Sequence, residues 1–304
     1  MKKKILVIAG GISNEREISL RSGQHVAEQL KKAGYDVILG DPQDKDFDLG
    51  VIGKGVFVAL PMLHGQGGED GLIQAELEKH GILYVGSRPK ACQKRYSKDK
   101  CKVIMAEHGI LTPAWQVVDK QQFDKSGLRE SAYVLKPIRG GSSIDMLIVH
   151  NPDHQPVDEN YVMSLFEKYD HMLLEELIEG QEVTVGILGD KPLPLIQIIP
   201  PAGEEFDFTN KYNGKTTEIP NPPDISIEKQ QEAQATALRM HEVIGCRDIS
   251  RTDMIIAENG AIYVLEINTA PGMTEASLYP KAVQAAGINM PDFMETLVLL
   301  GAKR

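Results

Sequence analysis

The chain has 304 residues, a formal net charge of −10, 42% hydrophobic residues and 25% charged residues. This length suffices for two or three domains, and the composition is ordinary for a globular protein. The acidic balance argues against a nucleic-acid groove, while a local basic site for phosphate stays compatible with it. Three cysteines without CxxC spacing indicate a reducing cytoplasm, with no disulfide frame and no zinc knot. No apolar stretch is long enough to span a membrane.

Residues 1–87 are predicted to form a small α/β domain. Its first apolar run resembles a signal peptide, but it is short and acidic residues follow at once, so a strand is the better interpretation. Ligands of such sheets gather at the carboxyl ends of strands, so the loops 10–17 and 64–71 are expected to face one site. Glu15 and His64 are the candidates there. A first-turn carboxylate favoured by the helix dipole and an ordinary loop histidine remain the simpler alternatives.

Residues 88–180 form the second predicted domain. Lys98 lies at the head of a helix that ends near His108, and the strand 133–137 carries Lys136. The glycine- and serine-rich loop that follows offers many backbone N–H donors and is suited to lie over phosphates, although it lacks the Walker A spacing. A flexible surface turn would explain this loop equally well.

Residues 181–304 form the third predicted domain. Two strands are followed by the polar loop 200–224, whose length and aromatic residues indicate a lid, with a mobile insertion as the alternative. Lys211 gives this loop a charge with which to close on an anion. A helix over 228–244 and a helical tail over 279–300 complete the domain.

The most informative stretch runs from Cys246 to Thr274 and predicts a β-hairpin. Asn259-Gly260 is the strongest short-range signal for a two-residue type I′ turn. With that turn, Asp253 faces Glu266 and Arg251 faces Asn268, and all four side chains lie on one face. The same pairing places four apolar side chains on that face: Ile255, Ala257, Ile262 and Val264.

The two opposed carboxylates pose a physical problem. Directly opposite Cβ atoms lie about 4.5–5.5 Å apart, so one acid must protonate or a cation must lie between them. Asp253, Glu266 and Asn268 together offer the hard oxygen ligands that Mg²⁺ prefers. The turn 269–274 that follows can bring the N–H of Gly272 close to an anion. A surface hairpin with a solvated acidic end is the alternative.

Seven segments, in order, resemble the D-alanine–D-alanine ligase family of the ATP-grasp superfamily. They are GGISNEREISLRSG (10–23), LHGQGGEDG (63–71), KPIRGGSS (136–143), LLEELIEGQE (173–182), FDFTNKY (206–212), SRTD (250–253) and LEINTAPGMT (265–274). The resemblance implies an α/β fold, α+β in parts, with a three-domain ATP-grasp architecture and an N-terminal open α/β domain. It also implies a reaction in which a D-alanine carboxylate takes the γ-phosphoryl group of ATP. The amine of a second D-alanine then displaces phosphate.

The resemblance assigns roles to particular residues. Asp253, Glu266 and Asn268 would hold two Mg²⁺ ions, with Mn²⁺ as a possible substitute, while Arg251 and the Gly272 N–H would face the oxyanion. The residues implied for ATP are Lys98, Lys136, Ser142, Ser143, Glu175, Glu176, Leu177, Glu182 and Lys211. The residues implied for the two D-alanines are Glu15, His64, Ser277 and Leu278. Tyr212 would reach Ser142, and Ser142 would reach Glu15, so that lid closure links the domains.

One departure from the family pattern stands out. The family has glycine two residues after the paired serines, where this chain has Asp145. A carboxylate there adds charge near the phosphates and disfavours the positive φ of glycine. The resemblance further implies a cytoplasmic homodimer that supplies peptidoglycan precursors, with no nucleic-acid or membrane partner. Ligation to D-lactate or D-serine, or an impaired nucleotide-binding paralogue, are the alternatives. The Lys-Tyr pair of the lid favours an amine as second substrate.

Overall fold

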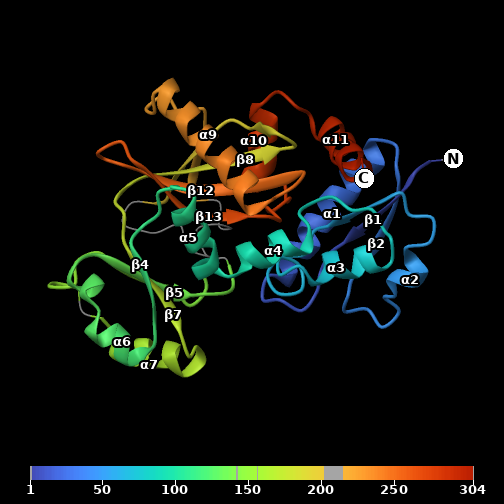
Figure 1. The fold of residues 1–304 in the computed structure, drawn as a ribbon. Coiled ribbons are helices and arrows are strands. Elements are labelled where there is room, and N and C mark those ends of the chain that lie inside the picture. The colour runs from blue at the N-terminus through green and yellow to red at the C-terminus, as the bar shows by residue number, and fades with distance from the viewer. Residues whose placement is uncertain (1, 142, 156, 202–214, 304) are drawn as a thin grey trace.

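The computed structural model describes residues 2–141, 143–155, 157–201 and 215–303, and their strands form three sheets (Figure 1). The first sheet is parallel, in the order β2-β1-β3. β1 and β3 are apolar and buried along nearly their whole length, as expected for strands that are covered on both faces, whereas the edge strand β2 is partly exposed. The elements of this part are β1 (Lys4–Ile8), α1 (Arg16–Lys32), β2 (Asp36–Gly40), α2 (Leu49–Ile52), β3 (Val58–Pro61) and α3 (Leu72–Lys79).

The second sheet is antiparallel, in the order β4-β7-β5-β6. Phe123, Val162 and Leu165 from its helices pack against its apolar face. Two helices precede the sheet, and the first, which begins at Pro89, was missed in the sequence. The elements are α4 (Pro89–Tyr96), α5 (Lys98–Glu107), β4 (Trp115–Val118), α6 (Lys120–Lys125), η1 (Gly127–Glu130), β5 (Tyr133–Pro137), β6 (Leu147–Val149), α7 (Glu159–Lys168) and β7 (Met172–Glu176).

The third sheet runs β11-β10-β8-β12-β13, with β9 paired to β8. Helix α9 covers the face that carries Met254, Ile256 and Val264. In Figure 1 this sheet lies above the second one, and the first sheet lies to the right of both. The elements are β8 (Gly180–Leu188), β9 (Lys191–Pro192), β10 (Ile196–Ile199), β11 (Thr217–Pro220), α9 (Ile227–Ile244), β12 (Ile249–Ala257) and β13 (Ile262–Asn268).

The hairpin β12-β13 confirms the pairing of Asp253 with Glu266 and of Arg251 with Asn268. The predicted turn was wrong. The Ala257 N–H donates to Ala261 O at 2.9 Å, so the loop has three residues and ends at Gly260, whose φ is +80°. A β-bulge restores the expected register, since the partners shift between Asp253 and Met254.

Because of the bulge, the prediction of which apolar residues share the face of the acids was wrong in part. Ile262 and Val264 lie in the core beneath α9 rather than beside the acids. Leu265 lies on the acid face instead, where it lines the same cavity as Ile255 and Glu266. The physical reason is that one extra residue reverses the alternation of side chains along a strand.

The tail is two helices rather than one. Helix α10 (Leu278–Ala285) ends before Gly287, whose φ is +77°, and α11 (Met290–Ala302) begins after Asn289. The Asn289 side chain accepts a hydrogen bond from the Asp292 N–H at 3.0 Å and so caps α11. Helix α11 packs on α1 and β3, so the end of the chain returns to the first sheet (Figure 1). The predicted domain boundaries near residues 87 and 180 stay predictions.

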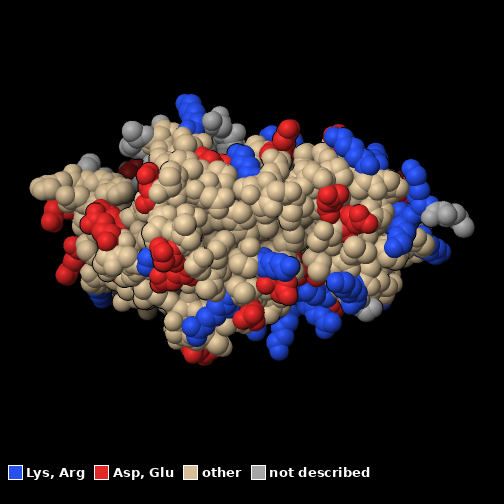
Figure 2. All heavy atoms as spheres, turned by 90° about the horizontal axis from the view of Figure 1, so that it is seen from above, with Lys and Arg blue, Asp and Glu red and all other residues tan. Residues whose placement is uncertain are grey.

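Two further observations concern the helices and the surface. Within the described ranges, none of the helices has the length and hydropathy that crossing a bilayer requires. Figure 2 shows one face of the molecule, on which acidic and basic side chains are interspersed across a largely uncharged surface.

Candidate active site

A cavity of about 400 Å³ is lined by strands of the second and third sheets and by loops of the first. It brings together most residues that the sequence assigned to ATP and its metal. Those that line it are Lys98, Lys136, Ser143, Glu175, Glu176, Leu177, Glu182, Asp253 and Glu266. Glu15, which was expected to bind the first D-alanine, lines it as well.

A second cavity of about 80 Å³ adjoins the first and shares Glu15 and Glu266 with it. It collects the residues expected for the two amino-acid substrates: Glu15, His64, Arg251, Gly272, Ser277 and Leu278. Asn268, which was expected to bind the metal, lines it as well. The remaining predicted site residues, Ser142, Lys211 and Tyr212, lie outside the described residues.

Three charged side chains form a cluster beside the larger cavity, whose wall includes two of them, Lys136 and Glu175. The Glu175 carboxylate pairs with both Lys136 and Lys102. Burial opposes ionisation of Glu175, but the two lysines outweigh it and hold the pKa of Glu175 below its usual value. The sequence prediction for Glu175 was contact with adenine. The structure shows that its carboxylate already balances two ammonium groups, so its first effect is to hold Lys136 at the cavity.

Lys102 was missed as a site residue. It is only 1% exposed, and its Nζ donates to Thr112 Oγ1 at 2.7 Å. The signal was present in the sequence. Lys102 lies four residues after Lys98 on the same helix, and residues at that spacing share a helix face.

Lys98 lies under the glycine-rich loop, where its Nζ donates to Gly140 O at 2.7 Å and to Pro137 O at 3.3 Å. Burial lowers the pKa of Lys98 to about 8. The positive charge that would attract phosphate is therefore present below about pH 8 and is lost above it.

We expect kcat/KM for ATP to fall as the pH rises through about 8, approaching tenfold per pH unit, because neutral Lys98 no longer attracts phosphate. Between about 8 and the ordinary value of 10.5 the unfolded chain binds more protons, so the contribution of Lys98 to stability rises with pH in that window. A pH–rate profile of the native chain and of Lys98→Arg checks this. The arginine variant stays charged and should give a flatter limb; an equally steep fall in both would contradict the assignment.

Asp253 and Glu266 meet across the hairpin as predicted, but the sequence argument missed the contacts that Arg251 and Thr184 make with Asp253. Arg251 binds both oxygens of Asp253, with Nε to Oδ1 at 2.9 Å and Nη2 to Oδ2 at 2.8 Å. Thr184 on β8 donates to Asp253 Oδ1 at 2.6 Å. An arginine thus balances part of the charge that the sequence argument assigned to a metal or a proton alone.

The donor set still fits Mg²⁺. Within the described ranges no three His, Cys, Asp or Glu side chains cluster as a ready-made metal cage. Mg²⁺ seldom uses such a cage, because it keeps waters and shares its ligands with substrate phosphates. Asp253, Glu266 and Asn268 lie where the two cavities meet and offer only oxygen, or an amide that can present oxygen.

The turn after β13 is held from both sides. Asn268 Oδ1 accepts from the Ala270 N–H at 3.0 Å, and Ser277 Oγ accepts from the Thr274 N–H at 3.1 Å. A Cβ on Gly272 would lie 3.0 Å from Ser277 Oγ. Only a small residue therefore lets this strand of backbone lie against the start of α10.

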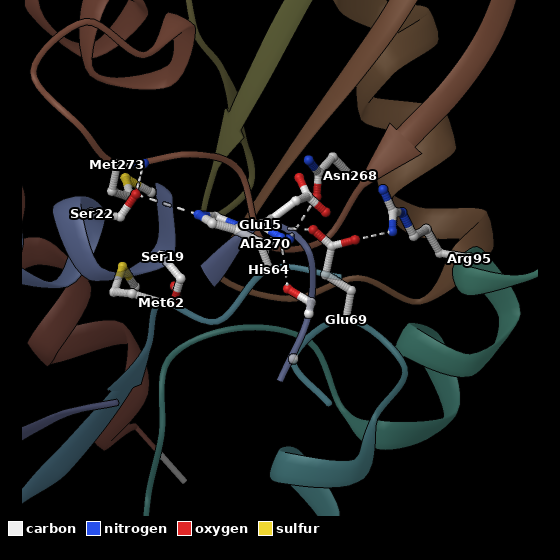
Figure 3. Close-up of polar contacts among 12 residues, drawn as sticks. Glu15, Ser19, Ser22, Met62, His64, Glu69, Arg95, Asn268, Ala270 and Met273 are labelled. Atoms are coloured by element: carbon white, nitrogen blue, oxygen red, sulfur yellow. Dashed lines mark hydrogen bonds and ion pairs between the residues drawn. The ribbon is translucent and has the colours of Figure 1, made fainter. Parts of the chain in front are cut away.

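Glu15 lies at the junction of three segments. Its Oε2 would lie 3.0 Å from a Cβ on Gly65 and 3.5 Å from one on Gly141, so both glycine-rich loops approach this carboxylate. Figure 3 shows Glu15 among His64, Glu69 and Asn268. The two loops of the first sheet do face one site, as the sequence predicted.

The backbone expected to contact adenine has one restriction. The N–H of Glu176 donates to Ala114 O at 2.9 Å, and that of Leu177 donates to Ala132 O at 3.0 Å. These two residues can therefore offer a nucleobase their carbonyl groups but not these N–H groups. Ile178, the next residue, also lines the cavity.

The structure corrects the expectation that Asp145 disfavours a positive φ and adds uncompensated charge. Its φ is +58°, so it adopts the backbone conformation that glycine would favour. Its carboxylate accepts hydrogen bonds from Lys168 and Tyr169 at the end of α7, and these partners hold its pKa below the ordinary value although burial acts the other way. The added charge is thus balanced, and the loop is fastened to α7.

We expect Asp145→Gly to raise KM for ATP about two- to fivefold with little change in kcat, which is the size of one partly exposed ion pair. The glycine keeps the positive φ but releases the loop from α7. Steady-state kinetics in ATP checks this. Lys168→Met should reproduce the rise, and the double variant should add little to it. A lower KM in Asp145→Gly would show that charge repulsion, not fastening, dominates.

Two sheets that enclose a lysine-lined cavity, with paired acids at one end, define an enzyme of the ATP-grasp class. The protein-family model described as the D-Ala–D-Ala ligase C-terminus matches residues 104–299 of this chain. The D-alanine–D-alanine ligases of Syntrophotalea carbinolica and Clostridium beijerinckii are 38% and 39% identical, over 99% and 97% of this chain and 96% and 97% of theirs. The chain therefore belongs to the D-alanine–D-alanine ligase family.

Solved structures agree with this membership. The ligase of Bacillus anthracis complexed with ATP superposes with a TM-score of 0.82 at 31% identity, covering 98% of this chain and 97% of that one. The ligase of Coxiella burnetii, at 24% identity and a TM-score of 0.79, shows the shared fold over 100% of this chain and 94% of that one.

Proposed function

We propose that this chain joins two D-alanine molecules into D-alanyl-D-alanine, with ATP converted to ADP and phosphate. The observation that carries the proposal is the pair of adjoining cavities. One is lined by the residues expected for ATP, the other by those expected for the amino acids, and Glu15 and Glu266 belong to both.

In the larger cavity Lys98 and Lys136 bind the phosphates of ATP, and the loop with Ser142 and Ser143 covers them. Glu175 holds Lys136, the carbonyls of Glu176 and Leu177 face adenine, and Glu182 takes the ribose hydroxyls. Phosphoryl transfer depends on alignment and charge neutralisation more than on covalent chemistry, which suits this arrangement. Lys211 closes on the phosphates from the lid.

Asp253, Glu266 and Asn268 would hold two Mg²⁺ ions. When bound, the ions neutralise phosphate charge and orient the γ-phosphoryl group. Asp253 is oriented by Thr184 and Arg251, which fix the carboxylate before metal arrives.

In the smaller cavity Glu15 binds the ammonium of the first D-alanine, with His64 beside it. The carboxylate of that D-alanine attacks the γ-phosphorus to give an acyl phosphate and ADP. The second D-alanine, held by Ser277 and the Leu278 N–H, attacks the acyl carbon through its amine. Arg251 and the Gly272 N–H stabilise the oxyanion, after which phosphate leaves and the ammonium proton is lost.

Tyr212, Ser142 and Glu15 connect the lid, the glycine-rich loop and the first sheet, so that lid closure excludes water from the acyl phosphate. We further propose that the enzyme acts in the cytoplasm, in peptidoglycan precursor synthesis, and that it is a homodimer. Ligation to D-lactate or D-serine is the second candidate within the same chemistry.

Mass spectrometry of the products formed from ATP, Mg²⁺ and equal D-alanine, D-serine and D-lactate tests the proposal. The expected result is D-alanyl-D-alanine with one ADP and one phosphate for each dipeptide. An ester with D-lactate or a mixed dipeptide with D-serine as the main product would overturn the substrate assignment. ATP binding without D-alanine-dependent phosphate release would overturn the enzymatic role.

A further inference from the structure

Arg95, in the last turn of α4, is a buried cation that the function above leaves without a role. Its side chain is 6% exposed. Its Nε donates to the carbonyl of Ile267 at 2.7 Å, and its Nη1 pairs with the Glu69 carboxylate. Ile267 lies between two proposed metal ligands, Glu266 and Asn268, so Arg95 holds the backbone at the end of β13 that carries them.

Beyond Glu69 a further series of contacts links buried side chains (Figure 3). Glu69 Oε1 lies 3.9 Å from His64 Nδ1, and His64 Nε2 lies 3.3 Å from Ser22 Oγ. Ser22 Oγ in turn accepts from the Met273 N–H at 3.3 Å. This series of contacts starts at Ile267 on β13 and ends at Met273, so it spans the turn that carries Asn268 and Gly272.

We propose that Arg95 is a positioning residue that fixes this turn, and with it the spacing between the metal ligands and the Gly272 N–H. The inference deepens the proposed function and rests on it. A small displacement of such groups costs about 10²-fold in rate, which is why a buried anchor outside the reacting atoms can matter.

The charge arrangement around Arg95 supports this role. Arg95 faces the acids Glu69, Glu266 and Glu15. Burial opposes ionisation of Glu69, but Arg95 and, after it, His64 lower the pKa of Glu69 to about 2. Both partners are therefore charged at neutral pH. An arginine is needed because its planar fork can bind a carbonyl and a carboxylate at once, whereas a lysine ammonium is a single point of charge.

The competing interpretation is a purely structural ion pair, whose loss lowers stability but not the activity of molecules that remain folded. Kinetics per folded molecule separate the two. We expect Arg95→Met to lower kcat about 100-fold and to raise the Mg²⁺ concentration for half-maximal rate about tenfold. KM for ATP should change less than about threefold, because the substitution does not touch the cluster of Lys102, Lys136 and Glu175. Arg95→Lys should recover part of kcat.

Arg95→Met leaves Glu69 buried without its partner and can unfold the chain. The double variant Arg95→Met, Glu69→Met removes both charges, so it should fold, and it should keep the low kcat. Arg247→Met is the matched control, because Arg247 also binds a backbone carbonyl, that of Gly86, at 2.9 Å from its Nε. It should change neither kcat nor the Mg²⁺ dependence.

Native kcat and Mg²⁺ dependence in the folded double variant would overturn the inference. Failure of the native chain to form D-alanyl-D-alanine would instead overturn the proposed function, so the two failures are distinct.

Discussion

Asp253→Asn is expected to lower kcat about 10³-fold, the order of effect seen when one preorganised electrostatic contact to a reacting group is lost. The change removes a negative charge from the point where the two cavities meet and replaces a metal-binding oxygen by an amide. The amide can still accept from Thr184, so the fold should persist. Steady-state kinetics across a Mg²⁺ series, together with the melting temperature, measure both effects.

Glu258→Gln is the matched control for Asp253→Asn. Glu258 is an exposed acid in the loop of the same hairpin, so the substitution removes the same charge without touching either cavity. Its kcat should stay within about twofold of the native value, as for most surface changes. Native-like activity of Asp253→Asn at low Mg²⁺ would contradict the metal-binding role of the hairpin.

Glu175→Gln is expected to lower the free energy of unfolding by about 3 kcal/mol, because breaking a buried ion pair from one side leaves uncompensated charge. Here the buried ammonium group of Lys102 and the partly buried one of Lys136 lose their shared partner. Activity should fall as well, since Lys136 is no longer held at the cavity. Urea unfolding at neutral pH measures the change.

The pH dependence of Glu175→Gln gives an independent check. The folded pKa of Glu175 lies below the ordinary 4.5, so its stabilisation is present above 4.5 and is lost as the pH falls through the folded value. The stability difference between native chain and variant should therefore shrink in acid. Glu176→Gln, at the exposed neighbouring position, is the control and should change stability by less than about 0.5 kcal/mol. A constant difference down to the lowest pH would contradict the ion-pair explanation.

The hairpin shows both the reach of sequence reasoning and its limit. The alternation of side chains and the Asn-Gly signal predicted that Asp253 meets Glu266, and the structure confirms the pair. The turn was wrong by one residue and a bulge compensated for it. A bulge forms where the packing of neighbouring elements is better served by an extra residue, here beneath α9, and the local sequence carries no signal for that.

Asp145 shows the same limit in another form. The sequence could show that an acid replaces the family's glycine. Its partners, Lys168 and Tyr169, follow more than 20 residues later, after a strand and a helix. Because these two residues lie at the end of α7, the added carboxylate binds them and holds the loop against this helix.

By itself the sequence determined what depends on local order and residue type: the strands and helices with strong periodicity, the glycine-rich loops, the acid pair and the family. The tertiary structure alone decided which charged and polar side chains contact one another. Arg95 with Glu69, Lys102 with Glu175 and Thr184 with Asp253 come from elements far apart in the chain. Such contacts follow from how sheets and helices pack, and packing is a property of the whole chain.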